Sequence, residues 1–351
     1  MKRIGTSLVF ILVFGLTTVS FAKSRREFFY SEAIDNYTII DQISAWSPLH
    51  NKAYQEKFEN EFGLTNSVKN LLNDYKKIRE KYIIKPDLKA QHLFPSNSIY
   101  LDTFSRAFFT ADTMSEAYKN LKDVVGEEDH KFLLDFYDVM LKKIKPWRQQ
   151  SQSFQNHIKL FEKEFKKGKG RQTIKKLINF FNLDKKEFRK IYYSFAWAPE
   201  FEQPSVEFMS NIMLIKINPV DKMARPDFSI IMSEIVDALL DAQSDSQKAS
   251  FSSQFLKECK IKNMPSSLKL KWPLSIAAGA IVYSSHKNKK DFNIAKEWSK
   301  NPWVQSYSQI LFILIEKSMK RRDHLMGKFL TESAVCCQNL INLSDFISGL
   351  E

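Results

Sequence analysis

Apolar residues recur every three or four positions along most of the chain, and this spacing predicts a mainly helical protein. The clearest case is the set Phe154, Ile158, Phe161 and Phe165, which places four large apolar side chains on one face of a helix. The segment 206–217 differs, because its β-branched and apolar content predicts a strand. We therefore expect a mainly α protein of the α+β class, a helical bundle-like fold with a small β element.

The predicted elements group into two regions. A helical N-terminal region covers 23–205 and includes a short helix over 185–195, and the region 206–351 contains the strand and two apolar helices. No stretch rich in Gly, Pro or Ser separates the regions, so we expect them to form one compact unit.

The most apolar helix is predicted over 227–243, with Asp227 or Ser229 as its N-cap. Apolar residues cover most of its surface, so the helix should be buried. Ser233, Glu234 and Asp237 interrupt this apolar surface. A buried carboxylate is unfavourable unless it is paired, hydrogen-bonded or bound to metal. Because the two acids lie three residues apart, one should have a raised pKa or recruit a Lys or Arg.

The N-terminus has the pattern of an export signal. Lys2 and Arg3 precede an apolar run over 4–19, and Ser20-Phe21-Ala22 fits a small-x-small cleavage site. We expect a signal peptide over 1–22 and an exported protein, periplasmic or secreted. An uncleaved anchor is the alternative, and the short apolar run followed by basic residues argues against it.

Composition and charge narrow the fold class and the range of possible binding partners. The 351 residues include 29 Phe and only 9 Gly, which favours helices over a fold of strands and turns. The formal net charge is +13, which points to an anionic partner. Since export argues against nucleic acid, an anionic envelope component, with peripheral membrane contact, is the more natural specific partner. Solvated basic faces without a specific partner remain the favoured interpretation of the charge.

Three cysteines, Cys259, Cys336 and Cys337, leave two possibilities open. Either Cys336 or Cys337 forms a disulfide with Cys259 and one thiol stays free, or all three are buried thiols. Their spacing matches no zinc-finger pattern.

The segment 233–237, Ser-Glu-Ile-Val-Asp, occupies the frame of H-E-x-x-H, the helix motif in which two histidines hold zinc and the glutamate acts as general base. An exported leader and the segment 35–58 (DNYTIIDQISAWSPLHNKAYQEKF) come first, followed by a long helical region and one apolar strand segment. The H-E-x-x-H-like helix, a helix of small residues over 268–284 and a helical tail complete the chain. This order resembles secreted bacterial metallopeptidases of the gluzincin-like type.

The resemblance implies a peptidase scaffold that has lost its zinc ligands. The first ligand position falls on Ser233, the general base on Glu234 and the second ligand on Asp237. The nearest fit to the third ligand is Ser275, in the helix of small residues. All three ligand positions depart from the pattern, whereas a catalytic zinc needs three protein ligands. The six histidines show no ligand spacing either. We therefore expect no metal and no other cofactor.

These observations favour an exported, non-catalytic envelope protein, a pseudoenzyme that binds a peptide or an envelope component in the former active-site cleft. Ser233, Glu234, Asp237 and Ser275 would line this cleft, and an extended peptide would pair with the strand beside it. One alternative is a hydrolase centred on Glu234 that uses no zinc or recruits other ligands. Another is a purely structural helical binding protein, in which the two acids pair with buried Lys or Arg.

Overall fold

The computed structural model describes most of the chain. The described residues are 26–47, 50–82, 103–183, 188, 190–200, 205–209, 211–219, 228–260, 267–286, 294–295 and 297–348. The expected signal peptide over 1–22 and the expected N-cap Asp227 lie outside them. Among the described residues, no helix is both long enough and apolar enough to cross a bilayer.

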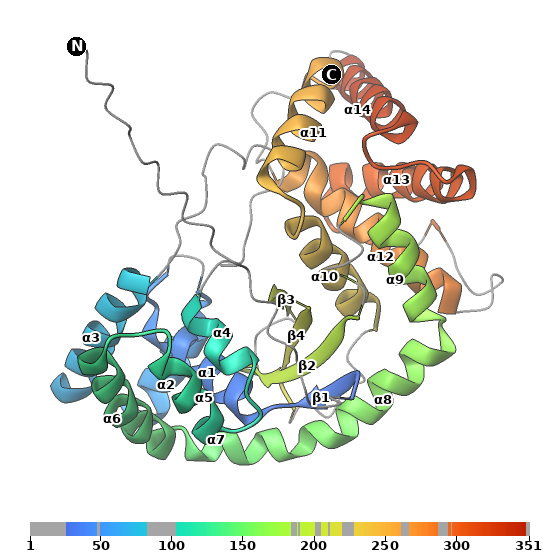
Figure 1. Cartoon of the computed structure of the whole chain (residues 1–351). Coiled ribbons are helices and arrows are strands. Elements are labelled where there is room, and N and C mark those ends of the chain that lie inside the picture. Colours follow the sequence, from blue (N-terminus) through green and yellow to red (C-terminus); the bar gives the residue numbers. More distant parts are fainter. Residues whose placement is uncertain are drawn as a thin grey trace, which may run out of the picture.

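Helices dominate the fold, and one small sheet lies among them (Figure 1). The helices are α1 (Glu32–Ser44), α2 (Lys52–Phe62), α3 (Asn66–Tyr82), α4 (Thr103–Phe109), α5 (Met114–Lys122), α6 (Glu127–Lys143), α7 (Lys145–Gln150), α8 (Phe154–Lys167), α9 (Gly170–Phe180), α10 (Phe228–Asp241), α11 (Asp245–Glu258), α12 (Trp272–His286), α13 (Pro302–Arg321) and α14 (Lys328–Ser348). The strands are β1 (Phe28–Tyr30), β2 (Tyr192–Trp197), β3 (Ser205–Met209) and β4 (Ile212–Ile217). The predicted class, mainly α with a small β element, is confirmed.

The sheet brings together strands that are far apart in the sequence. Its order is β1-β2-β4-β3, in which β1, β2 and β4 are parallel and β3 runs antiparallel to β4. Phe28 of β1 pairs with Tyr193 of β2, and Tyr193 pairs with Met213 of β4. The sheet therefore contains strands from both the N-terminal and the C-terminal part of the chain.

Two local predictions need correction. The single strand expected over 206–217 is two strands, since β3 ends at Met209, β4 begins at Ile212 and the two pair antiparallel. The helix expected over 185–195 is wrong from Tyr192 onward, where the chain forms β2, and residues 185–187 and 189 lie outside the described residues. Every residue of β2 is buried, as in a parallel strand covered on both faces, so β2 has no alternation of polar and apolar positions. A short apolar run of this kind does not distinguish strand from helix.

Aromatic packing holds the sheet on α8, the long helix beneath it in Figure 1. Phe161 lies 5.6 Å from Phe28 of β1 and 5.6 Å from Phe195 of β2, measured between ring centroids. Phe165 contacts Phe28 at 5.4 Å, and the rings of Phe154 and Phe195 are 6.3 Å apart. The predicted apolar face of this helix is thus the face that covers the sheet.

A buried polar cluster ties α1 to α3. Arg79 donates from Nε to Oδ1 of Asp41 at 2.8 Å, and the Tyr75 hydroxyl donates to the same oxygen at 2.8 Å. The Arg79 guanidinium also lies over the rings of Trp46 and Phe104, at 4.5 and 4.4 Å from their centroids. Burial acts to raise the pKa of Asp41, but the positive charge of Arg79 and the contacts with His50 and Trp46 together outweigh it and hold that pKa well below its usual range.

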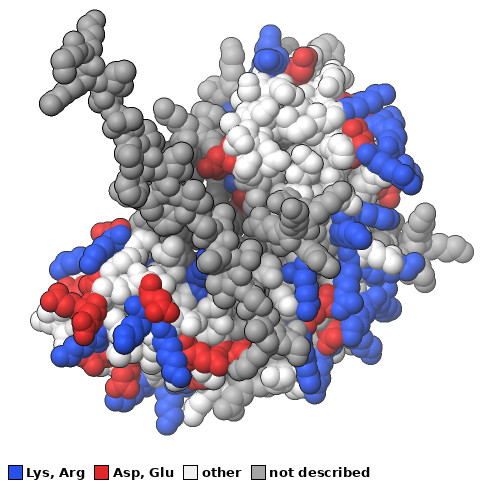
Figure 2. Space-filling model, in the orientation of Figure 1, with Lys and Arg blue, Asp and Glu red and all other residues white. Residues whose placement is uncertain are grey.

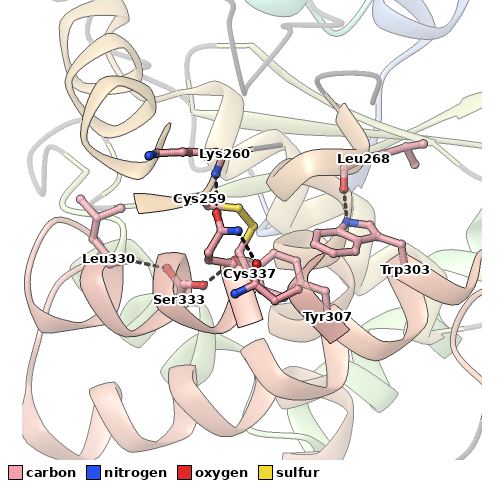
Figure 3. Close-up of a disulfide and its surroundings, with 10 residues drawn as sticks. Cys259, Lys260, Leu268, Trp303, Tyr307, Leu330, Ser333 and Cys337 are labelled. Carbon is pink, nitrogen blue, oxygen red and sulfur yellow. Dashed lines mark hydrogen bonds between the residues drawn. A yellow bond between two sulfur atoms is a disulfide. The ribbon is translucent and has the colours of Figure 1, made fainter. Parts of the chain in front are cut away.

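A disulfide joins the end of α11 to α14 (Figure 3). Cys259 pairs with Cys337, while Cys336 is a half-buried free thiol. Of the possibilities that the sequence left open, the structure therefore selects pairing through Cys337. Next to the bridge, the Lys260 backbone N–H donates to Oε1 of Gln338 at 2.9 Å, so covalent and hydrogen bonds hold the same two segments.

We expect loss of this disulfide to destabilise the protein strongly. The bridge spans 78 residues, and a loop of that length restricts the unfolded chain by about 4 kcal/mol. Cys337→Ser should lower the free energy of unfolding by up to that amount, as measured by denaturant titration without reductant. Cys336→Ser is the matched control and should change stability little; equal effects of the two substitutions would contradict the pairing.

Candidate functional site

The candidate site lies where α10 and α12 pack side by side. Three cross-helix pairs define their register: Ser233 with Gly279, Asp237 with Ser275, and Asp241 with Lys271 just before α12. Four residues forward along α10 correspond to four residues backward toward the start of α12. The two helices are therefore antiparallel, and one turn of helix separates each pair from the next.

Gly279 allows the close approach of the two helices. A Cβ atom built at this position would lie 2.3 Å from Oγ of Ser233 and 2.7 Å from its Cα. Any larger residue would push the backbones apart. The structure thus gives one of the small residues in the second apolar helix a definite role, which is contact with the first candidate position of the site.

Asp237 and Ser275 are in direct contact. The Ser275 hydroxyl oxygen is 2.9 Å from Oδ1 of Asp237 and 2.9 Å from the backbone oxygen of Lys271, and its single proton can serve either acceptor. The other Asp237 oxygen, Oδ2, lies 3.0 Å from Nζ of Lys271. Asp237 and Ser275, which occupy the second and third ligand positions implied by the resemblance, therefore bind each other, and both also contact Lys271.

Lys271 is the residue around which the site is built. It ends a π-helical turn, Ser267–Lys271, and its side chain is only 1% exposed. Its ammonium lies between two carboxylates, at 3.0 Å from Asp237 and 2.9 Å from Asp241. Burial acts to lower the pKa of Lys271, but the two carboxylates more than offset this and raise it. Burial raises the pKa of Asp241 in spite of the ammonium.

Glu234 faces the sheet. Its helix, α10, packs against β3, and the backbone of Val206 in that strand acts to lower the pKa of the Glu234 carboxyl group. Burial is the main effect that raises the pKa of Glu234 to about 7, and the negative charge of Asp237 adds to it. Lys216 of β4 is also nearby, but its ammonium is bound to Glu207 at 2.6 Å. Glu234 therefore links α10 to the outermost strand of the sheet.

The sequence named four site residues, and the structure arranges them along one helix pair. Asp237 and Ser275 touch, Ser233 lies one turn away against Gly279, and Glu234 contacts β3. Both consequences expected of two close acids occur, because Glu234 has a raised pKa and Asp237 has recruited a lysine.

Two residues of this cluster were missed. Asp241 follows Asp237 by four residues, so it lies on the same helical face, and this spacing was a readable signal. Lys271 had no such signal. It lies 30 residues beyond Asp241 in the sequence and reaches the cluster only because α12 folds back along α10.

The arrangement does not fit a zinc ion. The three expected ligand positions hold Ser233, Asp237 and Ser275, and the second and third of these are bonded to each other. The Lys271 ammonium already pairs with Asp237 and with Asp241, the carboxylates that a metal would need. Among the described residues, no group of three His, Cys, Asp or Glu side chains could hold a metal ion.

Comparisons with known proteins find no match: no family model, no curated protein and no solved structure is similar to this chain. The resemblance to gluzincin-like metallopeptidases therefore stays a prediction, carried by the H-E-x-x-H frame and the order of elements.

Removing the ammonium group that Asp237 and Asp241 share should destabilise the folded protein. We expect Lys271→Met to lower the free energy of unfolding by roughly 3–5 kcal/mol, because it takes from the buried Asp241 and the partly buried Asp237 the ammonium that both bind. Adding Asp237→Asn and Asp241→Asn to this variant should recover much of the loss. Denaturant titration measures all three proteins, with Lys257→Met on the exposed surface of α11 as control. If Lys271→Met matched this control, the ammonium would not hold the site together.

The raised pKa of Glu234 predicts a pH-dependent stability. An unfolded glutamate ionises near pH 4.3 and the folded one near 7, so between these values the folded state holds an extra proton. Wild-type stability should therefore fall as pH rises through this window. Glu234→Gln removes this contribution, and its stability relative to wild type should increase by roughly 2 kcal/mol between about pH 5 and about pH 8.

The exposed Glu258→Gln is the matched control for this effect. Unfolding free energies of the three proteins at both pH values provide the measurement. A pH-independent difference between Glu234→Gln and wild type would mean that Glu234 ionises normally in the folded protein.

Proposed function

We propose that this protein is an exported, non-catalytic envelope protein that binds an extended peptide along β3, on a scaffold like that of a metallopeptidase. The observation that carries the proposal is the contact between Glu234 of α10 and the backbone of β3. It puts the outer strand of the sheet beside the helix that the resemblance identifies with the peptidase active site. We expect a peptide to bind there as an added strand, the mode by which extended peptides pair with an exposed sheet edge.

The position of β3 in the sheet supports a peptide-binding role. Within the described part of the chain, β3 pairs with β4 on one side and is the last strand in the order β1-β2-β4-β3. An edge strand offers backbone donors and acceptors to an incoming strand. A bound peptide would extend the sheet at this edge, with α10 beside it.

The ion pairs of the site support the absence of catalysis. A peptidase needs an activated water, and the resemblance would supply it through zinc. Here a fixed ammonium takes the place of the cation between Asp237 and Asp241. The same carboxylates cannot both bind Lys271 and hold a metal, so the groups that remain can bind a peptide but lack the means to activate water through zinc.

One observation favours a second candidate, a hydrolase that uses Glu234 as an acid or base. A carboxyl group with a pKa of about 7 exchanges protons efficiently near neutral pH. No nucleophile accompanies it among the contacts described above, and its neighbour Asp237 is engaged by Lys271 and Ser275. This reading therefore ranks second.

A library of immobilised random decapeptides tests the proposal. We expect wild type to bind a subset of peptides, and backbone hydrogen exchange to slow in β3 when the best binder is added. An added strand uses every second backbone amide of the peptide. N-methylation of one alternating set of amides should therefore weaken binding at least about tenfold, while the other set, the matched control, should have little effect.

Three results would contradict the proposal. The first is no binding to any peptide, and the second is protection confined to helices away from β3. The third is stoichiometric zinc in the purified protein, which would restore the enzyme reading. Cleavage of library peptides by wild type, lost in Glu234→Gln, would favour the hydrolase candidate.

A further inference from the structure

Nearly half of the formal net charge lies on two consecutive helices. Residues 159–180, in α8, α9 and the two residues between them, carry eight basic and two acidic side chains, a net charge of +6 out of the total of +13. The eight basic residues, called here the basic strip, are Lys159, Lys163, Lys166, Lys167, Lys169, Arg171, Lys175 and Lys176. All eight are exposed. Figure 2 shows basic side chains gathered along the edge formed by these helices.

The amphipathic pattern of α8 puts its share of the strip on a single face. Phe154, Ile158, Phe161 and Phe165 are buried against the sheet, so the lysines of this helix project from the opposite face. Leu160 lies on that outer face among the lysines and is 47% exposed. On α9, Arg171, Lys175 and Lys176 are exposed while Ile174, Leu177 and Ile178 are buried.

Most of this charge is uncompensated. Lys166 pairs with Glu162 at 2.5 Å, and Arg171 pairs with Glu27. The other six members of the strip make no ion pair with any described residue. The helices α3 and α6 differ, because α6 carries five acidic and three basic residues, and α3 carries five basic and two acidic residues, one of the basic ones being Arg79, which is buried against Asp41. The strip is therefore a local excess of positive charge rather than a general feature of the surface.

We propose that the basic strip docks the protein on an anionic lipid bilayer, with Leu160 entering the headgroup region. Seven of the eight basic residues are lysines, whose flexible point charges suit a diffuse negative surface better than directed recognition of single phosphates. An exposed leucine among them adds an apolar contact that a bilayer accepts and a soluble polyanion does not. The proposal rests on the predicted export of the chain and is independent of peptide binding.

Co-sedimentation with lipid vesicles tests this docking. We expect the wild-type protein to bind vesicles of phosphatidylcholine with about one third phosphatidylglycerol and to dissociate from them as the salt concentration is raised. It should not bind vesicles of phosphatidylcholine alone. A strip variant, Lys159→Gln, Lys163→Gln, Lys167→Gln and Lys175→Gln combined, should bind at least about tenfold more weakly. Leu160→Ser should weaken binding by a smaller factor without changing its salt dependence.

The matched control removes four charges elsewhere. Lys69, Lys119, Lys122 and Lys131 are exposed on α3, α5 and α6, and their combined change to Gln should leave vesicle binding within about twofold of wild type. Thermal unfolding of each variant establishes that it is folded. Equal losses in the strip and control variants would overturn the proposal, since net charge alone would then explain binding. Binding to heparin but not to anionic vesicles would also overturn it.

Discussion

The C-terminal half of the structure depends on one buried ammonium. Lys271 lies between Asp237 and Asp241 in the interface between two largely apolar helices. Such a pair contributes little net stability, because desolvation offsets the attraction, but separating its members is strongly unfavourable. Sliding α12 along α10 by one turn would leave at least one carboxylate unpaired. The ion pairs therefore select one register for two helices whose apolar surfaces would tolerate several.

That register has consequences beyond the helix pair. It places Gly279 opposite Ser233, where no larger residue fits, and it places Ser275 where it can donate to Asp237. It also holds α10 so that Glu234 reaches the backbone of Val206. The sheet in turn includes β1 and β2 from the N-terminal part of the chain and rests on α8. One electrostatic constraint is thus transmitted through α10 to the strand edge on which the proposed peptide binding depends.

Charged side chains are stabilised in different ways in the candidate site and in the basic strip. Inside the α10–α12 interface every carboxylate needs a partner, and the chain provides Lys271 or, at Glu234, a raised pKa that favours the neutral form. On the outer faces of α8 and α9 the charges are solvated, so an excess of one sign is tolerated and remains available to an external surface. Helix α8 combines a buried and a solvated surface, because its apolar face packs against the sheet and its opposite face exposes the lysines.

The sequence by itself determined the features that depend on neighbours within one or two turns. These include the helical class, the buried face of α8, the apolar character of α10 and the need of Glu234 and Asp237 for compensation. Only the tertiary structure decided that Lys271 is the partner, that Cys337 rather than Cys336 pairs with Cys259, and that residues 192–197 form a strand. Each of these outcomes depends on a segment more than twenty residues away, and local periodicity carries no information about which distant segments meet.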